Sequence, residues 1–206
     1  MKEENMGKTA QYKSNRHFMV QALFFLGTVL INFILPRTAG ALGLPLYLDN
    51  VGTLLAAVLG GYLPGIFVGY LNNIINMQGN PGNAYYVVLS TMIAASGAYL
   101  GRKGWFDKLG KAVLTVPLFA FIGGALGSVL TYLLYGFGMG EGISAPFARV
   151  LLNNGTLSIF WAQMISDVTI DLIDKGITVA LVFIILRLIP ERVKPHVADP
   201  TPAFRT

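Results

Sequence analysis

The sequence contains no cysteine, and its two histidines, His17 and His196, lie near the two ends of the chain. Without cysteine there is no disulfide framework, no thiol nucleophile and no thiolate metal site. Without an internal imidazole, a common general base and metal ligand is missing as well. The motifs of zinc peptidases, serine hydrolases, Walker-type nucleotide hydrolases and dinucleotide-binding proteins are also absent. We therefore expect a protein that is not an enzyme and that has no metal and no cofactor of its own.

Charged residues are also scarce. They make up 12% of the sequence, whereas a soluble domain contains about a quarter. Apolar residues make up 54%, and the mean hydropathy is +0.60. The apolar runs are long enough for helices, and the roughly ten-residue alternating segments of a membrane barrel are absent. The first sixteen residues are polar and no cleavage site follows them, so we interpret the first apolar run as a retained helix of a multi-pass membrane protein.

The basic residues are concentrated in three short stretches. A net charge of +5 would also fit a nucleic-acid-binding protein, but clustering of this kind is what the positive-inside rule predicts for cytoplasmic segments. We therefore predict cytoplasmic N- and C-termini and no nucleic-acid partner. The twelve clustered residues are Lys2, Lys8, Lys13, Arg16, Arg102, Lys103, Lys108, Lys111, Arg187, Arg192, Lys194 and Arg205.

The apolar pattern predicts an all-α membrane protein built as a bundle of six transmembrane helices. We expect a cytoplasmic tail over 1–17, a transmembrane domain over 18–190 and a second cytoplasmic tail over 191–206. The second and third helices form a hairpin around Gly60-Gly61-Tyr62-Leu63-Pro64-Gly65, because glycine and proline favour a turn followed by a helix start. The predicted helices are Phe18–Leu35, closed by Pro36; Leu46–Leu59; Ile66–Asn76; Ala84–Leu100; Ala112–Tyr135; and a last one from Ile159 or Ile165 to Ile189.

The second and third predicted helices are short for a membrane span, which needs about 20 apolar residues. Either the bilayer thins around them, or their outer ends lie within the protein and line a cavity. The segment 136–158 is long for a simple connection and mixes glycine, asparagine and charged residues with apolar ones. It is a candidate interfacial or re-entrant piece and a possible lid over such a cavity.

Polar residues that are costly to expose to lipid gather at the outer end of this hairpin and in the last helix. Asp49 lies at the start of the hairpin, Asn72 and Asn76 share a face near its end, and Asp167 and Asp171 share a face of the last helix. We predict that these five residues form a substrate-binding site near the extracytoplasmic surface. A lining of carboxylates and amides suits a small polar ligand that carries a positive or hydrogen-bond-donating group.

The hairpin residues also have a structural interpretation. Asp49, with Asn50 and Thr53, fits an N-cap arrangement at a helix start. Asn72 and Asn76 fit hydrogen bonds to a neighbouring helix. The sequence alone leaves these alternatives open.

The aspartates of the last helix likewise have two interpretations. Asp167 fits a residue at a helix start, and Asp174 fits a membrane-surface residue paired with Lys175. Asp171 lies deeper, where a carboxylate needs a partner or a wet cavity, so we favour a functional role for it. Lys175, one turn further on, is a possible partner.

Two stretches of the sequence resemble a known family. The run Leu46-Tyr47-Leu48-Asp49-Asn50-Val51-Gly52-Thr53, followed by Gly60-Gly61-Tyr62-Leu63-Pro64-Gly65 and a helix ending in asparagines, resembles the substrate-binding S components of energy-coupling factor (ECF) transporters. The segment from Asp171-Leu172-Ile173-Asp174-Lys175-Gly176-Ile177 to Leu186-Arg187-Leu188-Ile189-Pro190 is similar to their last helix. The resemblance covers the second, third and sixth predicted helices.

The resemblance implies a subunit of the bacterial cytoplasmic membrane that captures a small vitamin-like micronutrient at the extracytoplasmic face. It also implies three partners, a transmembrane coupling subunit and two cytoplasmic ATPases, and the ATP is used by these partners. The chain also resembles the ligand-sensing membrane input domains of bacterial signalling proteins, which is the alternative function. A sensor would continue from Pro190 into an output domain, so we expect the transporter function from a chain that ends sixteen residues later.

Overall fold

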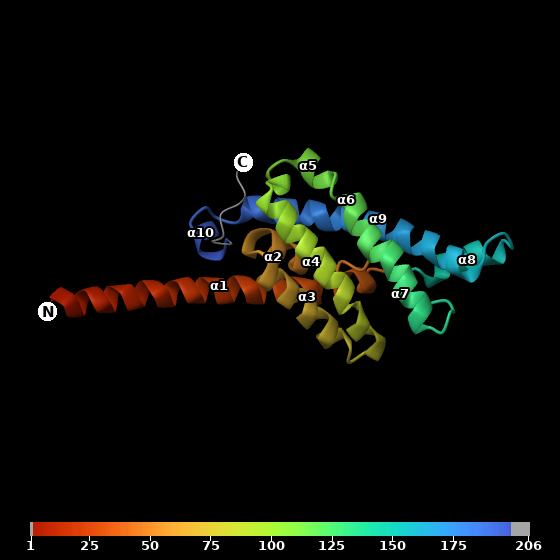
Figure 1. Ribbon diagram of the computed structural model, residues 1–206, viewed down its shortest axis with the longest axis horizontal. Coiled ribbons are helices and arrows are strands. Elements are labelled where there is room, and N and C mark those ends of the chain that lie inside the picture. Colours follow the sequence, from red (N-terminus) through yellow and green to blue (C-terminus); the bar gives the residue numbers. More distant parts are fainter. Residues whose placement is uncertain (1, 199–206) are drawn as a thin grey trace.

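The computed structural model describes residues 2–198, with side chains from Phe18 onward, and this part of the chain is helical without strands (Figure 1). Most of the described residues are helical. Among them, three helical stretches are long and apolar enough to cross a membrane: Phe18–Ala41, Pro81–Arg102 and Leu109–Leu134. The prediction of an all-α protein with membrane-spanning helices is therefore confirmed, whereas the count of six spans and the side on which the termini lie stay predictions. The end of the predicted C-terminal tail, residues 199–206, lies outside the described residues.

The first helix, α1, spans Lys2–Ala41, so the prediction that Pro36 closes it was wrong. Proline lacks an N–H group, so Pro36 cannot donate to the Asn32 carbonyl four residues earlier. Arg37 Nη1 donates to the Phe33 carbonyl at 2.8 Å, and Thr38 Oγ1 donates to the Ile34 carbonyl at 3.0 Å. Membrane helices tolerate proline within a helix more readily than soluble ones.

The hairpin consists of α2 (Val51–Gly60) and α3 (Tyr62–Asn76), joined at Gly61 within the predicted turn. The prediction that the second helix starts at Ile66 was wrong, because α3 starts four residues earlier and includes Pro64 in its first turn. Gly61 has a φ of 89°, a conformation that glycine adopts without strain. The prediction that the first helix of the pair begins at Leu46 was wrong, because residues 44–48 have no helical structure and α2 begins only at Val51. Leu48 has a φ of 49°, which is incompatible with a right-handed helix.

Helix α2 lies against α1 in the interior of the molecule. Asn32 of α1 accepts a hydrogen bond from the Gly52 N–H at 2.6 Å and donates one to Thr53 Oγ1 at 2.8 Å. An ideal Cβ on Gly52 would lie 1.8 Å from the Thr28 carbonyl oxygen, so the two backbones meet where only glycine fits. These contacts fix α2 between α1 and the helices that follow.

Helix α4 (Val87–Arg102) follows a short 3₁₀ helix, η1 (Pro81–Tyr86), and packs against the hairpin. Its small residues form a packing face, since Ser90, Ala94, Gly97 and Ala98 are all buried. At Gly97 an added Cβ would lie 2.5 Å from Leu54 Cδ1. The close approach of α4 to α2 therefore depends on these small side chains.

The fifth predicted helix is a chain of short elements between Leu109 and Leu134. After η2 (Trp105–Asp107) come α5 (Leu109–Val113), α6 (Val116–Ala120), the π-helical turn η3 (Phe121–Leu126) and α7 (Gly127–Leu134). Among the glycines of this stretch, Gly127 faces Leu89 of α4, whereas Gly123 and Gly124 face α9.

The last part of the chain contains α8 (Ala145–Asn153), α9 (Ile159–Leu188) and α10 (Lys194–Val197). Helix α8 lies inside the segment 136–158, where the sequence predicts an interfacial or re-entrant piece, and it packs against α9. Helix α9 has 30 residues and starts at the earlier of the two predicted positions. Its interior contains three aspartates and a lysine, which makes it less apolar than the three candidate spans.

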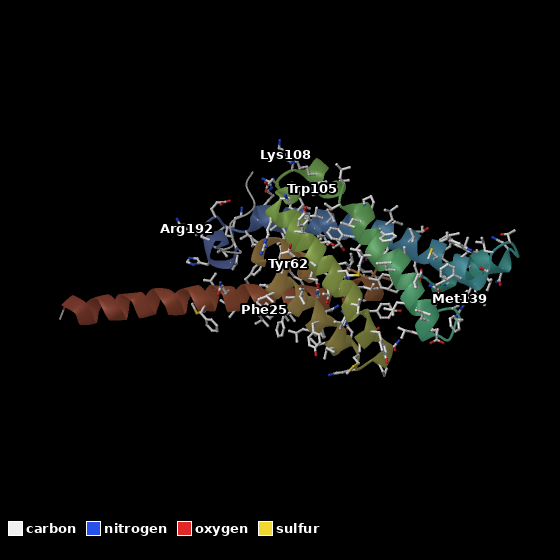
Figure 2. All side chains as sticks on the ribbon, viewed as in Figure 1. Phe25, Tyr62, Trp105, Lys108, Met139 and Arg192 are labelled. Carbon is white, nitrogen blue, oxygen red and sulfur yellow. The ribbon has the colours of Figure 1, made fainter. Side chains whose placement is uncertain are left out.

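The basic stretches gather at one end of the molecule. Arg187 of α9 donates to the Asp107 carbonyl, the Arg102 guanidinium lies 4.4 Å from the centre of the Tyr62 ring, and α10 packs against α1. Figure 2 shows Lys108, Trp105 and Arg192 toward this end, while Met139 lies near the opposite end beside α7 and α8. The end that contains η1 and α8 is therefore distinct from the basic end (Figure 1).

Candidate functional site

A cavity of about 500 Å³ lies between the hairpin, α4, η3, α7 and α9. Four of the five predicted site residues line it, and the fifth, Asn72, does not. The cavity belongs to the half of the molecule away from the basic end, since Asn80, Asn83 and residues 140–144 also border it. The four predicted residues are Asp49, Asn76, Asp167 and Asp171.

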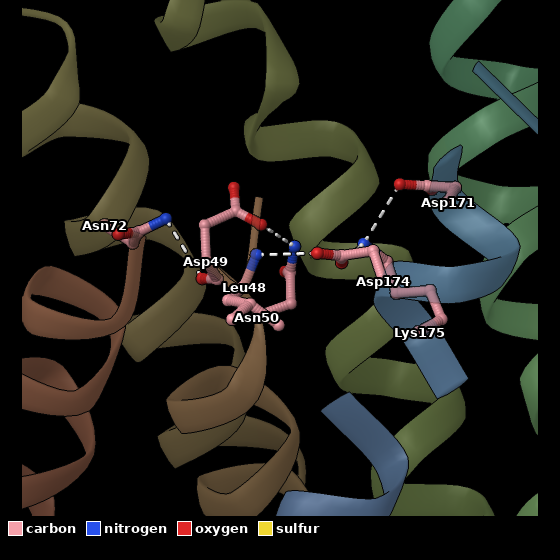
Figure 3. Close-up of polar contacts among 7 residues, drawn as sticks. All are labelled: Leu48, Asp49, Asn50, Asn72, Asp171, Asp174 and Lys175. Carbon is pink, nitrogen blue, oxygen red and sulfur yellow. Dashed lines mark hydrogen bonds and ion pairs between the residues drawn. The ribbon is translucent and has the colours of Figure 1, made fainter. Parts of the chain in front are cut away.

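Asn72 holds the segment before α2 in place. Its Nδ2 donates to the Asp49 backbone carbonyl at 3.2 Å (Figure 3). Its Oδ1 accepts from Asn76 Nδ2 at 3.1 Å. The structural alternative, hydrogen bonds to a neighbouring helix, is not what the structure has: Asn72 binds the loop before α2, and the Asn76 amide binds Asn72 of its own helix. Asn73, which is not among the five predicted site residues, lines the cavity and donates to Ser90 Oγ at 2.7 Å.

The N-cap interpretation of Asp49 was wrong. Asn50 occupies the N-cap position of α2, and its side chain makes no capping hydrogen bond. Asp49 Oδ1 instead accepts from Asn50 Nδ2 at 2.6 Å, while the Asn50 Oδ1 atom is buried without a hydrogen-bond partner (Figure 3). Both residues line the cavity.

Lys175 is the centre of a buried ion cluster. Its Nζ lies 2.7 Å from Asp174 Oδ2 and 3.3 Å from Asp171 Oδ1, and all three side chains are at most 5% exposed (Figure 3). The expected pairing of Lys175 with both aspartates is confirmed. The interpretation of Asp174 as a membrane-surface residue was wrong, because its side chain is fully buried. Its second oxygen, Oδ1, accepts from the Leu48 N–H at 2.7 Å and so fixes the loop before α2 against α9.

Only one of the two Asp171 carboxylate oxygens has a hydrogen-bond partner in this cluster, since Oδ1 accepts from Lys175. Its Oδ2 atom is buried and has no hydrogen-bond partner. The carboxylate fits against η3 only because residue 123 is glycine, since an ideal Cβ there would lie 1.8 Å from Oδ2. The π-helical turn, a feature often found at functional sites, therefore makes the space for the Asp171 carboxylate.

Asp167 is fully satisfied by uncharged donors. Oδ2 accepts from Ser128 Oγ of α7 at 2.6 Å, and Oδ1 accepts from Gln163 Nε2 at 2.7 Å and from Ser144 Oγ. The helix-start interpretation of Asp167 was wrong, because α9 begins at Ile159, two turns earlier. Asp167 joins α7, α9 and the start of α8.

Two further hydrogen bonds hold the segment 138–144 against α9. The Gly140 N–H donates to Gln163 Oε1 at 3.1 Å, and Ser166 Oγ donates to the Ser144 carbonyl at 2.7 Å. The segment starts after Gly136 and Phe137, which have φ values of 60° and 66°. Asp167 therefore belongs to a hydrogen-bond network that holds this border of the cavity against α9.

Asp167→Asn is expected to loosen the segment 138–144. The amide keeps one acceptor oxygen but turns the other position into a donor, which opposes the hydroxyl or amide donor already there. Loss of one or two buried hydrogen bonds should speed amide hydrogen exchange over 138–144 about tenfold. Glu191→Gln, at a site on the surface, is the control and should leave this exchange unchanged. Equal exchange in both variants would show that Asp167 does not hold the segment.

Sequence reasoning missed most of the neutral polar residues of the site. Ser128, Ser144 and Gln163 come from three separate elements and meet only around Asp167. Tyr86 lines the cavity and shares a 2.6 Å hydrogen bond with Thr131 of α7. Serine, threonine and glutamine are common in membrane helices as packing residues, so no single-sequence signal separates these from the rest.

The cavity lining contains many polar and acidic side chains. Among the described residues that border the cavity, four are acidic and Lys175 is the one basic residue. No group of three or more His, Asp or Glu side chains in the described part of the chain is arranged to hold a metal ion. The acidic residues are Asp49, Glu141, Asp167 and Asp171.

Comparisons of the chain with protein-family models, with curated proteins and with solved structures give no match.

Proposed function

We propose that the protein is the substrate-binding membrane subunit of an ECF-type transporter, which captures a small polar, vitamin-like micronutrient at the extracytoplasmic face of a bacterial cytoplasmic membrane. The observation that carries the proposal is the cavity of about 500 Å³, in which carboxylates and amides from separate helices come together. A cavity of this size suits a small ligand that is surrounded on most sides.

The distribution of charge supports the orientation of this site. The basic stretches gather at the end opposite to the outer rim of the cavity, and basic segments favour the cytoplasmic side. With that end inside, the segments 77–83 and 136–144 face outward and border the cavity mouth. In the proposed topology α1, α2, α3, α4, the stretch from α5 to α7, and α9 are the six membrane helices.

The short hairpin fits the same proposal. Helices α2 and α3 have 10 and 15 residues, which is less than the roughly 20 that a helix needs to cross a bilayer. Their outer ends contain Asn50, Asn72 and Asn73, all buried within the protein. Polar and irregular backbone at membrane depth is tolerated where it lines a cavity.

The test is the set of proteins that co-purify with the chain from native membranes. An ECF-type subunit should recover a transmembrane coupling subunit and two ATPases, and ATP hydrolysis by these partners should drive uptake in reconstituted vesicles. Recovery of a kinase or phosphatase without ATPases would contradict the transporter proposal and favour the sensor. A chain that retains no small molecule and recovers no partner would contradict both.

A further inference from the structure

We infer that the molecule captured in this cavity is a small organic cation, whose protonated nitrogen donates a hydrogen bond to Asp171. The inference rests on the proposed capture of a small solute and names its chemical class. It is drawn from the charge balance of the buried cluster and from the hydrogen-bond acceptors that the cluster leaves without donors.

The buried cluster around Lys175 has more carboxylate groups than ammonium groups. Lys175 contributes one ammonium group, which contacts both Asp171 and Asp174, and Asp49 follows the Leu48 N–H that binds Asp174 (Figure 3). Lys175 therefore pairs with two buried carboxylates, and Asp49 adds a third carboxylate next to Leu48 in the chain. Burying unpaired charge is costly, and a ligand with a positive charge offsets that cost. A neutral ligand would leave the imbalance in place.

An anionic ligand is disfavoured by the same cluster. Lys175 is the basic side chain that the described part of the cavity offers, and its Nζ already lies within 3.3 Å of two carboxylate oxygens. A negative group that approached Lys175 would also approach Asp171 and Asp174, and like charges at short range repel strongly in a site of low dielectric constant. The cluster therefore selects against carboxylates and phosphates.

The unpaired atoms indicate that the cation carries N–H groups. Asp171 Oδ2 and Asn50 Oδ1 are both buried without a hydrogen-bond partner, and both residues border the cavity. Each is an acceptor, so each requires a donor. A protonated amine or amidine provides both the charge and the donors, whereas a quaternary ammonium provides only the charge.

The experiment compares ligand pools that differ in charge. Low-molecular-mass cell extract is separated by ion exchange at neutral pH into cationic, neutral and anionic fractions, and each is added to the purified protein in detergent. The cationic fraction is expected to raise the thermal unfolding midpoint by about 5 °C or more. Mass spectrometry of the retained species should then identify a protonated amine or amidine.

The unfolding midpoints of the wild-type protein with the three fractions are sufficient to decide the charge class of the captured molecule. Stabilisation by only the neutral or the anionic fraction would support capture of a solute but overturn the cation inference. Stabilisation by no fraction would overturn the proposed function and the inference together. These results do not depend on whether any variant folds.

Asp171→Asn tests the anchor atom. The variant keeps the shape of the side chain and removes its charge, so the affinity for the retained cation should fall about tenfold to a hundredfold. Glu191→Gln, which removes one negative charge from an 86% exposed side chain, is the matched control and should bind as the wild type does. Unchanged affinity in Asp171→Asn would remove Asp171 from the site.

Discussion

Gly123→Ala should destabilise the protein and weaken ligand binding together. The new Cβ would lie 1.8 Å from Asp171 Oδ2 and 3.2 Å from Lys175 Cε, so either the ion cluster or η3 has to move. Overpacking of this kind costs about 1–3 kcal/mol of unfolding free energy. Displacement of the Asp171 carboxylate should also lower ligand affinity at least about tenfold, because a charge-assisted hydrogen bond depends on geometry. Denaturant unfolding in detergent and ligand titration measure the two effects.

Two companion variants separate the clash from a general effect of alanine. Gly176→Ala, on α9, adds a Cβ with nothing within 4 Å and should leave stability unchanged or slightly increased. In an Asp171→Ala background, Gly123→Ala should cost much less, because the overlapping atom is gone. An equal cost with and without the Asp171 carboxylate would contradict the role given to Gly123.

Lys175→Met should be the most destabilising of the substitutions considered. It keeps most of the side-chain length but removes the ammonium group that Asp171 and Asp174 share. Breaking a buried ion pair by removing one partner costs about 3–5 kcal/mol, because the remaining charge is left unpaired. The free energy of unfolding in detergent measures this loss.

The chain offers a surface pair as a control. Lys194 Nζ lies 2.7 Å from Glu191 Oε1, and the Glu191 side chain is 86% exposed. Lys194→Met should therefore cost no more than about 1 kcal/mol. Adding Asp174→Asn to Lys175→Met should recover part of the loss, since one stranded carboxylate is removed and the Leu48 N–H keeps an acceptor. Equal losses in Lys175→Met and Lys194→Met would show that the cluster is not a buried one.

The sequence was sufficient to predict the features that depend on neighbours along the chain. Gly61 and Pro64 specify the turn between α2 and α3, and the apolar runs specify the helical stretches. The four-residue spacing of Asp171 and Lys175 predicts their pairing. Local rules of backbone conformation and helix periodicity are enough for each of these.

Features that depend on contacts across the fold could not be predicted in this way. The start of α2 shifts to Val51 because Leu48 donates its N–H to Asp174, 126 residues further on. The surroundings of Asp167 depend on Ser128 and Ser144, which lie in other elements. No local pattern encodes these partners.

The same reasoning separates the roles of the five predicted site residues. Asn72 supports the loop before α2 from outside the cavity, and Asp167 has all of its hydrogen bonds filled by neighbours. Asp171 borders the cavity with an oxygen atom that has no partner. We therefore expect ligand recognition to depend most on Asp171 and the stability of the cavity border to depend most on Asp167.

The most direct measurement is native mass spectrometry of the protein released from membranes, followed by analysis of whatever dissociates from it. We expect one small organic cation per wild-type chain, retained by Glu191→Gln and lost from Asp171→Asn. A wild-type chain that carries no small molecule, or one that carries the same molecule equally well after Asp171→Asn, would contradict a receptor built around this buried carboxylate.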